Sequence, residues 1–378
     1  MDAPIPISDA QLDDLHRLLL RTLNRNQILI ISNIPRVPTS ITSILREISR
    51  RFDVPLSTLK RNARILKELN LITYGDASNF QGVKLTELGR FVSQLVAKDD
   101  PTLLGNLVQT GSGLKPLGTV IKDLRKNALR MIAEAGSGHL GASLSAIDIL
   151  AVLYFLKMEH DPKNPNWEER DRFVLSKGHA APALYAVLAE AGYFPITELF
   201  TLRRLGGRLQ GHPETITPGV DAVSGSLGQG LSVGVGMALA AKMDEAKYTV
   251  YVLLGDGELN EGQVWEAAMT ASHLGLDNLV AIVDRNRFQL SGRTEDVKNL
   301  EPLGEKWNAI GWEVIEVDGN SPGEVLDALE RPGLINGRPS VIVARTTKGK
   351  GISFMEGNRF SRKVPDSSEL RRALDELS

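Results

Sequence analysis

The sequence predicts an α/β protein with a parallel sheet that is covered by helices on both faces and preceded by a small α+β domain. From residue 119 onward, short apolar runs alternate with long helical patterns, which is the order of strands and helices in a parallel sheet. Before residue 98, short helical patterns are followed by two β-like runs without such alternation. With 42% hydrophobic residues among 378, the chain is long and apolar enough for two separate cores.

The first domain, residues 1–97, is predicted to contain three helices and a hairpin. Amphipathic patterns cover residues 12–23 and 40–52, and a third covers 57–69, with Ser57 as its N-cap. The β-like runs 71–74 and 83–86 flank a polar loop that contains glycine, which predicts a β-hairpin. This order of elements, and the segment ISRRFDVPLSTLKRNARILKELNLIT, resemble the winged-helix family.

The third predicted helix has a basic face. Lys60, Arg64 and Lys67 share that face, and the apolar residues lie broadly opposite, namely Leu59, Ala63, Leu66 and Leu69. This is the layout of a DNA-recognition helix. Residues 1–100 carry only 14 Lys and Arg against 11 Asp and Glu, a net charge of +3, so DNA binding and a protein-interaction role both stay open.

Residues 98–118 contain Asp-Asp-Pro, Gly-Ser-Gly and Lys-Pro, and they are predicted to form a linker between the domains. The second domain, residues 119–378, then contains the predicted strands, which are 172–175, 249–254, 279–283, 312–317 and 340–344. Buried strands of a parallel sheet have such continuous apolar runs.

Composition excludes several classes of function. The chain has no cysteine, which excludes disulfides, thiolate catalysis and zinc–thiolate sites. Its net charge of −2 argues neither for nor against binding of nucleic acid. The N-terminus lacks a signal peptide, and no apolar run approaches the length needed to span a bilayer. We therefore expect a cytoplasmic protein without a membrane partner.

Polar side chains follow two consecutive strands of one β-α-β unit. The strand that ends at residue 254 runs into Gly255-Asp256-Gly257, and the next strand ends at Asp284-Arg285-Asn286. Ligands of open α/β sheets bind at the carboxyl ends of strands. One carboxylate and one amide suit Mg²⁺, which takes its other ligands from phosphates and water. The alternative is a tight turn followed by an ordinary loop amide.

Three histidines, His139, His179 and His212, each lie in a glycine-containing loop beside an apolar segment. Histidine transfers protons near neutral pH and hydrogen-bonds oxyanions. Each could instead be structural, as we expect for His16, His160 and His273, but their combination with a metal site favours function.

The spacing of Gly-Asp-Gly and the later Asn resembles the thiamine-diphosphate signature, and the chain from about residue 117 to 351 resembles the N-terminal region of transketolases. Successive blocks carry this resemblance in the family's order: SGHLGASLSAIDILAVLYF, DRFVLSKGHAAPALYAVLAEAGY, GHPE, SGSLGQGLSVGVGMALA and LGDGELNEGQVWEAAMTASHLGLDNLVAIVDRNRF. The resemblance implies a parallel-sheet fold that binds thiamine diphosphate and Mg²⁺, and a transferase of two-carbon ketol units.

The resemblance also assigns site residues. It implies that Mg²⁺ is bound by the side chains of Asp256 and Asn286 and the backbone carbonyl of Phe288. His139, His179 and His212 would surround the thiazolium ring and the donor sugar's hydroxyls. The other cofactor-binding residues that it implies are Gly225, Ser226 and Leu227 at the aminopyrimidine, together with Gly257, Glu258 and Lys348. Glu261 would join a carboxylate network across a subunit interface.

Two glycines in the helix that follows Ser226 have a structural explanation of their own. Gly234 and Gly236 are predicted to serve tight helix packing.

The sequence departs from the family pattern at two places. A Trp-His-Gly-Lys segment of related sequences is matched by Phe360-Ser361-Arg362-Lys363, so Ser361 replaces a histidine expected at the cofactor. The chain also ends at Ser378, without a segment for the second α/β domain that activates the cofactor and holds the sugar phosphate. The resemblance therefore implies a separate C-terminal subunit, in a heterotetramer of two of each, acting on sugar phosphates as in the pentose phosphate pathway.

Three hypotheses remain. The first is the cofactor-binding subunit of a split transketolase. The second is half of another thiamine-diphosphate enzyme, such as a 2-oxo-acid dehydrogenase component, which would leave the three histidine blocks unexplained. The third is a transcription regulator whose transketolase-like domain senses a ligand without catalysis.

Overall fold

The computed structural model describes residues 23–34, 39–52, 54–75, 81–97, 107–332, 337–357 and 364–378. The chain divides into two compact units, Met1–Gly118 and Thr119–Ser378. The elements of the first unit are α2 (Arg25–Ile31), α3 (Ile41–Phe52), α4 (Leu56–Glu68), β1 (Ile72–Thr73), β2 (Lys84–Leu85), α5 (Glu87–Ala97), β3 (Leu107–Thr110) and β4 (Gly113–Pro116).

Helix α2 was not predicted, although the sequence contains a signal for it. Asn24 and Gln27 form a reciprocal capping box, in which each side chain accepts a hydrogen bond from the backbone N–H of the other. Ile30 and Ile31 are then buried in the core of the unit. The predicted helix at 12–23 lies outside the described residues except for Leu23.

Helix α4 differs from the prediction at both ends. Pro55 is its N-cap residue, so the prediction of Ser57 as the N-cap is wrong, because the helix begins at Leu56. Leu69 follows the helix and is 51% exposed, so it does not share the buried face. Asn62 is buried instead, where its Nδ2 donates to the Thr58 carbonyl and its Oδ1 accepts from Asn24.

Strands β1 and β2 form the predicted antiparallel hairpin, with Ile72 opposite Leu85. The predicted linker is wrong from residue 107 onward, because β3 and β4 form a second hairpin and α6 begins at Leu117. Leu107 is buried in the core of the first unit, and its N–H donates to Asn33 Oδ1 at 2.8 Å. Residues 98–106 lie outside the described part of the chain.

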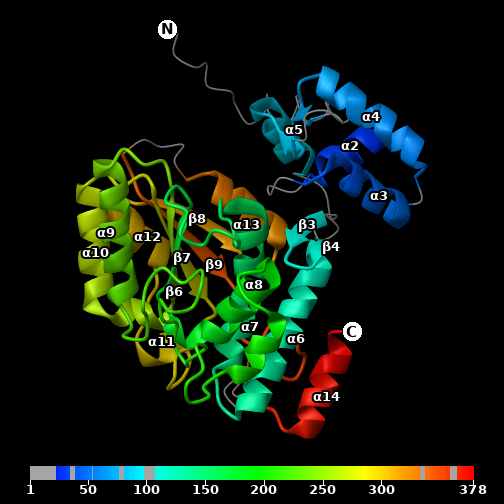
Figure 1. Ribbon diagram of the computed structural model, residues 1–378. Coiled ribbons are helices and arrows are strands. Elements are labelled where there is room, and N and C mark those ends of the chain that lie inside the picture. The colour runs from blue at the N-terminus through cyan, green and yellow to red at the C-terminus, as the bar shows by residue number, and fades with distance from the viewer. Residues whose placement is uncertain are drawn as a thin grey trace. The chain divides into compact units, whose positions relative to one another are not determined.

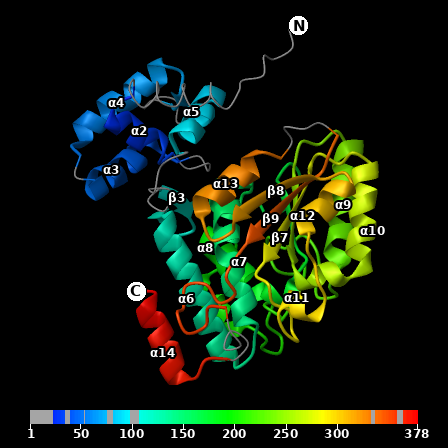
Figure 2. The same ribbon diagram turned by 180° about the vertical axis from the view of Figure 1, so that it is seen from behind.

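The second unit is built on a five-stranded, all-parallel sheet with the order β5-β6-β7-β9-β8 (Figures 1 and 2). Its strands are β5 (Arg172–Leu175), β6 (Val250–Gly255), β7 (Leu279–Arg285), β8 (Glu313–Asp318) and β9 (Ser340–Arg345). Each predicted strand agrees within two residues at either end. The sequence located them well because β6, β7 and β9 are buried over almost their whole length.

Helices cover both faces of this sheet, as predicted. Figures 1 and 2 show α9 (Gln229–Met243), α10 (Gly262–His273) and α12 (Leu303–Ala309) on one face. The helices of the other face are α6 (Leu117–Ala135), α7 (Leu140–Val152), α8 (Ala181–Ala191) and α13 (Pro322–Glu330). The short α11 (Thr294–Val297) follows β7, and α14 (Ser367–Glu376) is the last element of the chain.

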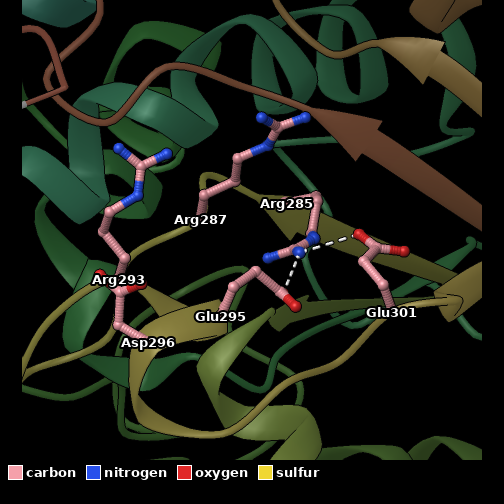
Figure 3. Close-up of a pocket in the computed structure, with 6 residues that line it drawn as sticks. All are labelled: Arg285, Arg287, Arg293, Glu295, Asp296 and Glu301. Atoms are coloured by element: carbon pink, nitrogen blue, oxygen red, sulfur yellow. Dashed lines mark hydrogen bonds and ion pairs between the residues drawn. The ribbon is translucent and has the colours of Figure 1, made fainter.

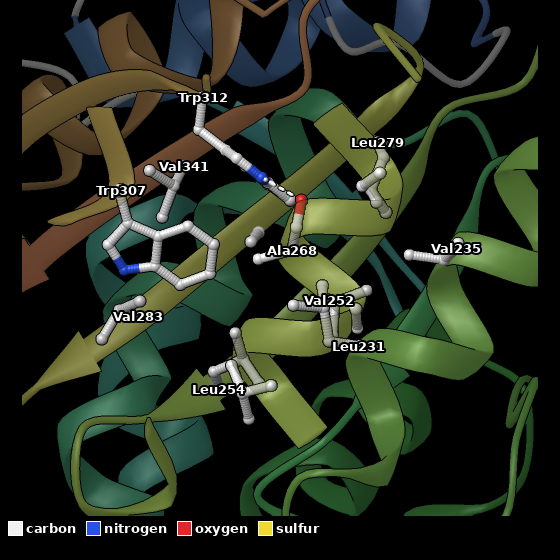
Figure 4. Close-up of a cluster of buried hydrophobic side chains, with 14 of the residues drawn as sticks. Leu231, Val235, Val252, Leu254, Ala268, Leu279, Val283, Trp307, Trp312 and Val341 are labelled. Atoms are coloured by element: carbon white, nitrogen blue, oxygen red, sulfur yellow. Dashed lines mark hydrogen bonds between the residues drawn. The ribbon is translucent and has the colours of Figure 1, made fainter. Parts of the chain in front are cut away.

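The core on the α9–α10 face contains two buried tryptophans. Trp307 and Trp312 meet edge to face at 4.9 Å between ring centroids, and Trp312 Nε1 donates to the Ala268 carbonyl at 2.8 Å (Figure 4). This contact ties α10 to the start of β8, so the helix that follows the Gly-Asp-Gly loop has a fixed position on the sheet.

The two glycines of α9 differ in their surroundings. A Cβ on Gly234 would lie 2.4 Å from Val252 Cγ2, which confirms that this glycine serves tight packing. A Cβ on Gly236 would meet nothing within 4 Å, so the packing prediction is wrong for that residue.

One helical stretch, Leu140–Lys157, is long and apolar enough to cross a membrane by length and composition. The prediction that no apolar run approaches such a length is therefore wrong. Because 89% of the stretch is buried inside the protein, its apolar character is that of a core helix.

Candidate functional site

The carboxyl ends of four parallel strands bring several of the predicted site residues to one edge of the sheet. Ser176 to His179 follow β5, Asp256 follows β6, Asn286 follows β7, and Lys348 comes shortly after β9. Gly255 on β6 is directly opposite Asp284 on β7, so the loops that carry Asp256 and Asn286 start side by side.

Asp256 is buried and held in one orientation by three donors. Its Oδ1 accepts from the Gly257 N–H at 2.8 Å, and its Oδ2 accepts from the Arg287 N–H at 2.5 Å and from Arg285 Nη1 at 3.1 Å. Burial and then the nearby Asp284 raise the pKa of Asp256 to about 6, against the opposing effect of Arg285. A divalent cation would favour the ionised carboxylate at this position.

Asn286 has both ends of its amide bonded. Its Nδ2 donates to Asp284 Oδ2 at 3.1 Å, and its Oδ1 accepts from the Phe288 N–H at 3.1 Å. Asp284 is fully buried and pairs with Lys177, which is also fully buried. Burial would raise the pKa of Asp284, but the Lys177 ammonium and further hydrogen bonds hold it below its ordinary value.

The side chains at these two strand ends fit the ligand set of Mg²⁺. Among the described residues, no group of three or more His, Cys, Asp or Glu side chains could hold a metal ion. One carboxylate and one amide oxygen at neighbouring strand ends are what Mg²⁺ uses when phosphate oxygens and water complete its octahedron. The loop geometry also explains why residue 257 is a glycine, since a Cβ there would lie 2.7 Å from the Cβ of Gln289.

Two of the three candidate histidines are in direct contact. The rings of His139 and His179 meet edge to face with centroids 5.2 Å apart. Burial and then Lys177 lower the pKa of His179 to about 3. Partial burial and then Arg203 lower the pKa values of His139 and His212. All three rings are therefore neutral at neutral pH, and each can donate or accept a hydrogen bond.

Arg203 connects the loops of two of these histidines, and sequence reasoning missed it. Its Nη1 donates to Ser137 Oγ at 2.6 Å, two residues before His139. Its guanidinium also lies close to Gly211, the residue before His212, because a Cβ built on Gly211 would be 2.9 Å from Arg203 Nε. Arg203 has an unusual backbone conformation for a non-glycine residue, with a φ of 58°, but this angle cannot be read from a sequence.

The loop that carries Gly225, Ser226 and Leu227 runs into α9. Gly225 has a φ of 145°, and a Cβ there would approach the His212 ring at 3.2 Å, so this loop passes close to that histidine. Ser226 and Leu227 are exposed. The Oγ of the neighbouring Ser224 is buried and has no hydrogen-bond partner in the described protein.

Glu258 and Glu261 have very different surroundings. The buried carboxylate of Glu258 accepts from Ser176 Oγ and from the N–H groups of Gly228 and Gly255, both at 2.9 Å. Burial raises its pKa, while these hydrogen bonds oppose the rise. Glu258 therefore ties three loops of the site together. Glu261 is exposed at the start of α10, beside Gly228.

Lys348 is buried with its Nζ 5.6 Å from the centroid of the Phe288 ring. It contributes to the lowered pKa values of His139 and His179, so its charge acts on the same region as the histidines. Ser361, where the sequence departs from the family pattern, and Lys363 of the same segment lie outside the described residues.

A pocket of about 350 Å³ is lined by charged side chains from the end of β7 and the segment after it (Figure 3). Its lining consists of Arg285, Arg287, Arg293, Glu295, Asp296 and Glu301. Arg285 donates to Asp256, Glu295 and Glu301, so it links the candidate metal site to the segment that follows β7. Sequence reasoning missed the roles of Arg285 and Lys177, although both are cations next to apolar strands and so require buried partners.

Comparisons with known proteins agree with this geometry. The family model described as "Transketolase, thiamine diphosphate binding domain" matches residues 118–365. The chain belongs to the transketolase family. It is accordingly an enzyme chain of the transketolase type. The hypothesis that it is half of another thiamine-diphosphate enzyme is therefore wrong.

Two relatives illustrate which transketolases it resembles. It is 49% identical over 251 residues to the 6-deoxy-6-sulfo-D-fructose transketolase subunit SqwG of Clostridium sp. (strain MSTE9), covering 66% of this chain and 91% of the relative. It is 44% identical over 255 residues to an apulose-4-phosphate transketolase subunit of Phocaeicola vulgatus, covering 67% of this chain and 91% of the relative.

The fold also matches solved structures. Transketolase from Campylobacter jejuni superposes with a TM-score of 0.65 at 36% identity, covering 69% of this chain and 42% of that chain. The transketolase-like unit therefore spans less than half the length of a complete transketolase, but nearly the whole length of the relatives named as subunits.

Proposed function

We propose that this chain is the N-terminal, cofactor-binding subunit of a split transketolase. The observation that carries the proposal is the difference in coverage. The matching region covers 91% of two relatives named transketolase subunits, but 42% of the solved Campylobacter transketolase. A chain of this type binds thiamine diphosphate and Mg²⁺ and transfers a two-carbon ketol unit between sugar phosphates with a C-terminal subunit. We propose a heterotetramer of two of each.

In this proposal Asp256, Asn286 and the Phe288 carbonyl hold Mg²⁺, and Lys348 faces the diphosphate. Gly257 and Glu258 shape the loop that borders it, and Gly225, Ser226 and Leu227 border the aminopyrimidine. When bound, thiamine diphosphate supplies the nucleophilic carbon that takes up the two-carbon unit. The protein's contribution at this edge is to neutralise and orient the diphosphate end.

The three histidines bind the sugar in this proposal. Because His139, His179 and His212 are neutral, each can accept a hydrogen bond from a sugar hydroxyl through one ring nitrogen and donate through the other. A neutral ring can also take up a proton from a hydroxyl during the transfer. Glu261, exposed at the start of α10, is available for a carboxylate contact with the partner subunit.

Reconstitution tests the proposal. The purified chain with thiamine diphosphate and Mg²⁺ is expected to show no ketol transfer until a transketolase C-terminal subunit is added. The Asp256→Asn variant is expected to stay inactive with that subunit. Robust turnover by the chain alone would contradict the two-subunit proposal, and binding of the cofactor without any reconstituted turnover would favour the sensing regulator.

For the first unit we propose a winged-helix domain that binds DNA or a protein. The exposed Lys60 and Arg64 on α4 favour DNA binding. The ammonium of Lys67, in contrast, donates to the Tyr74 carbonyl at 2.7 Å and lies over the Tyr74 ring. A gel shift with the full chain at low salt, compared with the Lys60→Glu/Arg64→Glu variant, separates the two partners. A shift that the variant loses and that salt weakens supports DNA binding, and no shift at low salt leaves the protein-interaction role.

A further inference from the structure

The side-chain amide of Asn286 can bind a metal in only one of its two orientations. Its oxygen can bind Mg²⁺, but its NH₂ group cannot, and the two ends differ only by a 180° rotation of the side chain. A site that left both orientations open would bind the metal only in the fraction of molecules with the oxygen facing it.

The neighbouring Asp284 fixes the orientation of the Asn286 amide. Asn286 Nδ2 donates to Asp284 Oδ2 at 3.1 Å, and a carboxylate can only accept, so the amide oxygen must point the other way. On that other side Asn286 Oδ1 accepts the Phe288 N–H, which uses one lone pair and leaves the second for a metal.

Asp284 is itself held as a pure acceptor by donors from three further elements. Ser145 Oγ on α7 donates to its Oδ2 at 2.6 Å, Thr346 after β9 donates to its Oδ1, and Lys177 after β5 pairs with its Oδ2. Lys177 Nζ also donates to the Ala142 carbonyl at 2.9 Å, so this ammonium has a fixed position under the site.

Stability alone does not account for such a pair. Lys177 and Asp284 are both fully buried, and a buried ion pair is often no more stabilising than apolar side chains of the same volume. Outer-shell partners that orient metal ligands, in contrast, commonly change metal affinity by about 10–100-fold when removed.

We propose that Asp284, paired with Lys177, is a positioning residue that fixes which end of the Asn286 amide faces the metal. This inference rests on the proposed function, because it concerns the same Mg²⁺ site. Asp284 does not touch the metal itself in this arrangement, and it acts only through Asn286.

The first test removes the charge pair and keeps its shape. In the Lys177→Met/Asp284→Asn variant, residue 284 can offer either an oxygen or an NH₂ group to Asn286. Calorimetric titration of Mg²⁺ into the full chain with saturating thiamine diphosphate is expected to show about a tenfold loss of affinity. Ser145→Ala is the control, because it removes another donor to Asp284 without changing the Asn286 contact, and it is expected to stay within about twofold.

In the second test, the expected change in Mg²⁺ affinity is opposite to the change that charge alone would produce. Asn286→Asp adds a negative charge to the metal site, which on charge alone would raise Mg²⁺ affinity. If Asp284 needs a donor at this position, the variant places two carboxylates in contact and Mg²⁺ affinity falls below that of the wild type. The change conserves volume, so it remains informative if the double variant fails to fold.

The outcomes separate the two proposals. Wild-type affinity in the double variant, or a raised affinity in Asn286→Asp, would overturn the positioning role and leave the Mg²⁺ site intact. A wild-type chain without Mg²⁺-dependent binding of thiamine diphosphate would overturn the proposed function together with this inference.

Discussion

The rings of His139 and His179 meet edge to face with centroids 5.2 Å apart, although the two residues come from different loops. His139 precedes α7 and its side chain makes no capping bond to that helix, whereas His179 follows β5. Burial disfavours protonation of both rings, the charge of Lys348 acts on both in the same direction, and the charge of Lys177 adds to the effect at His179.

This arrangement predicts a pH-dependent stability. The pKa of His179 is about 3 in the folded protein and about 6.5 in the unfolded chain, so between these values the unfolded state binds more protons. The stabilisation is fully present above pH 6.5 and is lost as the pH falls. From pH 6.5 to 5 the wild type is expected to lose about 1.5 kcal/mol more than His179→Asn.

Urea unfolding followed by tryptophan fluorescence measures this difference. All four tryptophans lie in the second unit, so the signal reports on the unit that contains His179. Equal losses in both proteins would show that the ring is protonated in the folded state at pH 5.

The sequence predicted the second unit far better than the first, and buried strands explain why. Strands such as β7 are apolar along nearly their whole length because both faces are covered, so their positions follow from the apolar runs alone. Asp256 and Asn286 could then be placed together, because parallel strands end at one edge of the sheet. No such rule predicted that Leu107 would join the first core, and residues 107–116 were mistaken for a linker.

The partners of buried charges could not be predicted either. Lys177 follows β5 and Asp284 is the residue before the last of β7, more than a hundred residues away, and only the strand order β5-β6-β7 brings them together. The sequence shows that each charge needs a partner, but not which one. The same limit applies to Arg203, whose contacts depend on the path of a loop.

The two glycines of α9 are expected to respond oppositely to alanine. Gly236→Ala should stabilise the second unit by about 0.5–1 kcal/mol, because alanine favours the helix and its Cβ meets nothing within 4 Å. Gly234→Ala should destabilise it by about 1–3 kcal/mol, because its Cβ would overlap Val252. Urea unfolding monitored by tryptophan fluorescence compares them, and a shift of the same sign in both variants would contradict the assignment.

Glu258 and Glu261 provide a second matched pair. Glu258→Gln turns one acceptor of a buried carboxylate into a donor that faces another donor, and should destabilise the unit by roughly 2–4 kcal/mol. Glu261→Gln is exposed and should change stability by less than about 0.5 kcal/mol. If Glu261 contacts the partner subunit, the same variant should raise the concentration of that subunit needed for half-maximal turnover, whereas unchanged reconstitution would exclude it from the interface.

Removal of the metal is expected to abolish stabilisation by the cofactor. At a thiamine diphosphate concentration about a hundred times its dissociation constant, the folded state gains about 2.7 kcal/mol, measurable as a raised unfolding midpoint. We expect this gain with Mg²⁺ and its loss with a chelator, because Lys348 alone does not neutralise a diphosphate. Asp256→Asn should lose the gain even with Mg²⁺, whereas Asp296→Asn, an exposed residue nearby on α11, should keep it. A midpoint that rises equally with and without Mg²⁺ would show that the diphosphate is held by cationic side chains, and that Asp256 has another role.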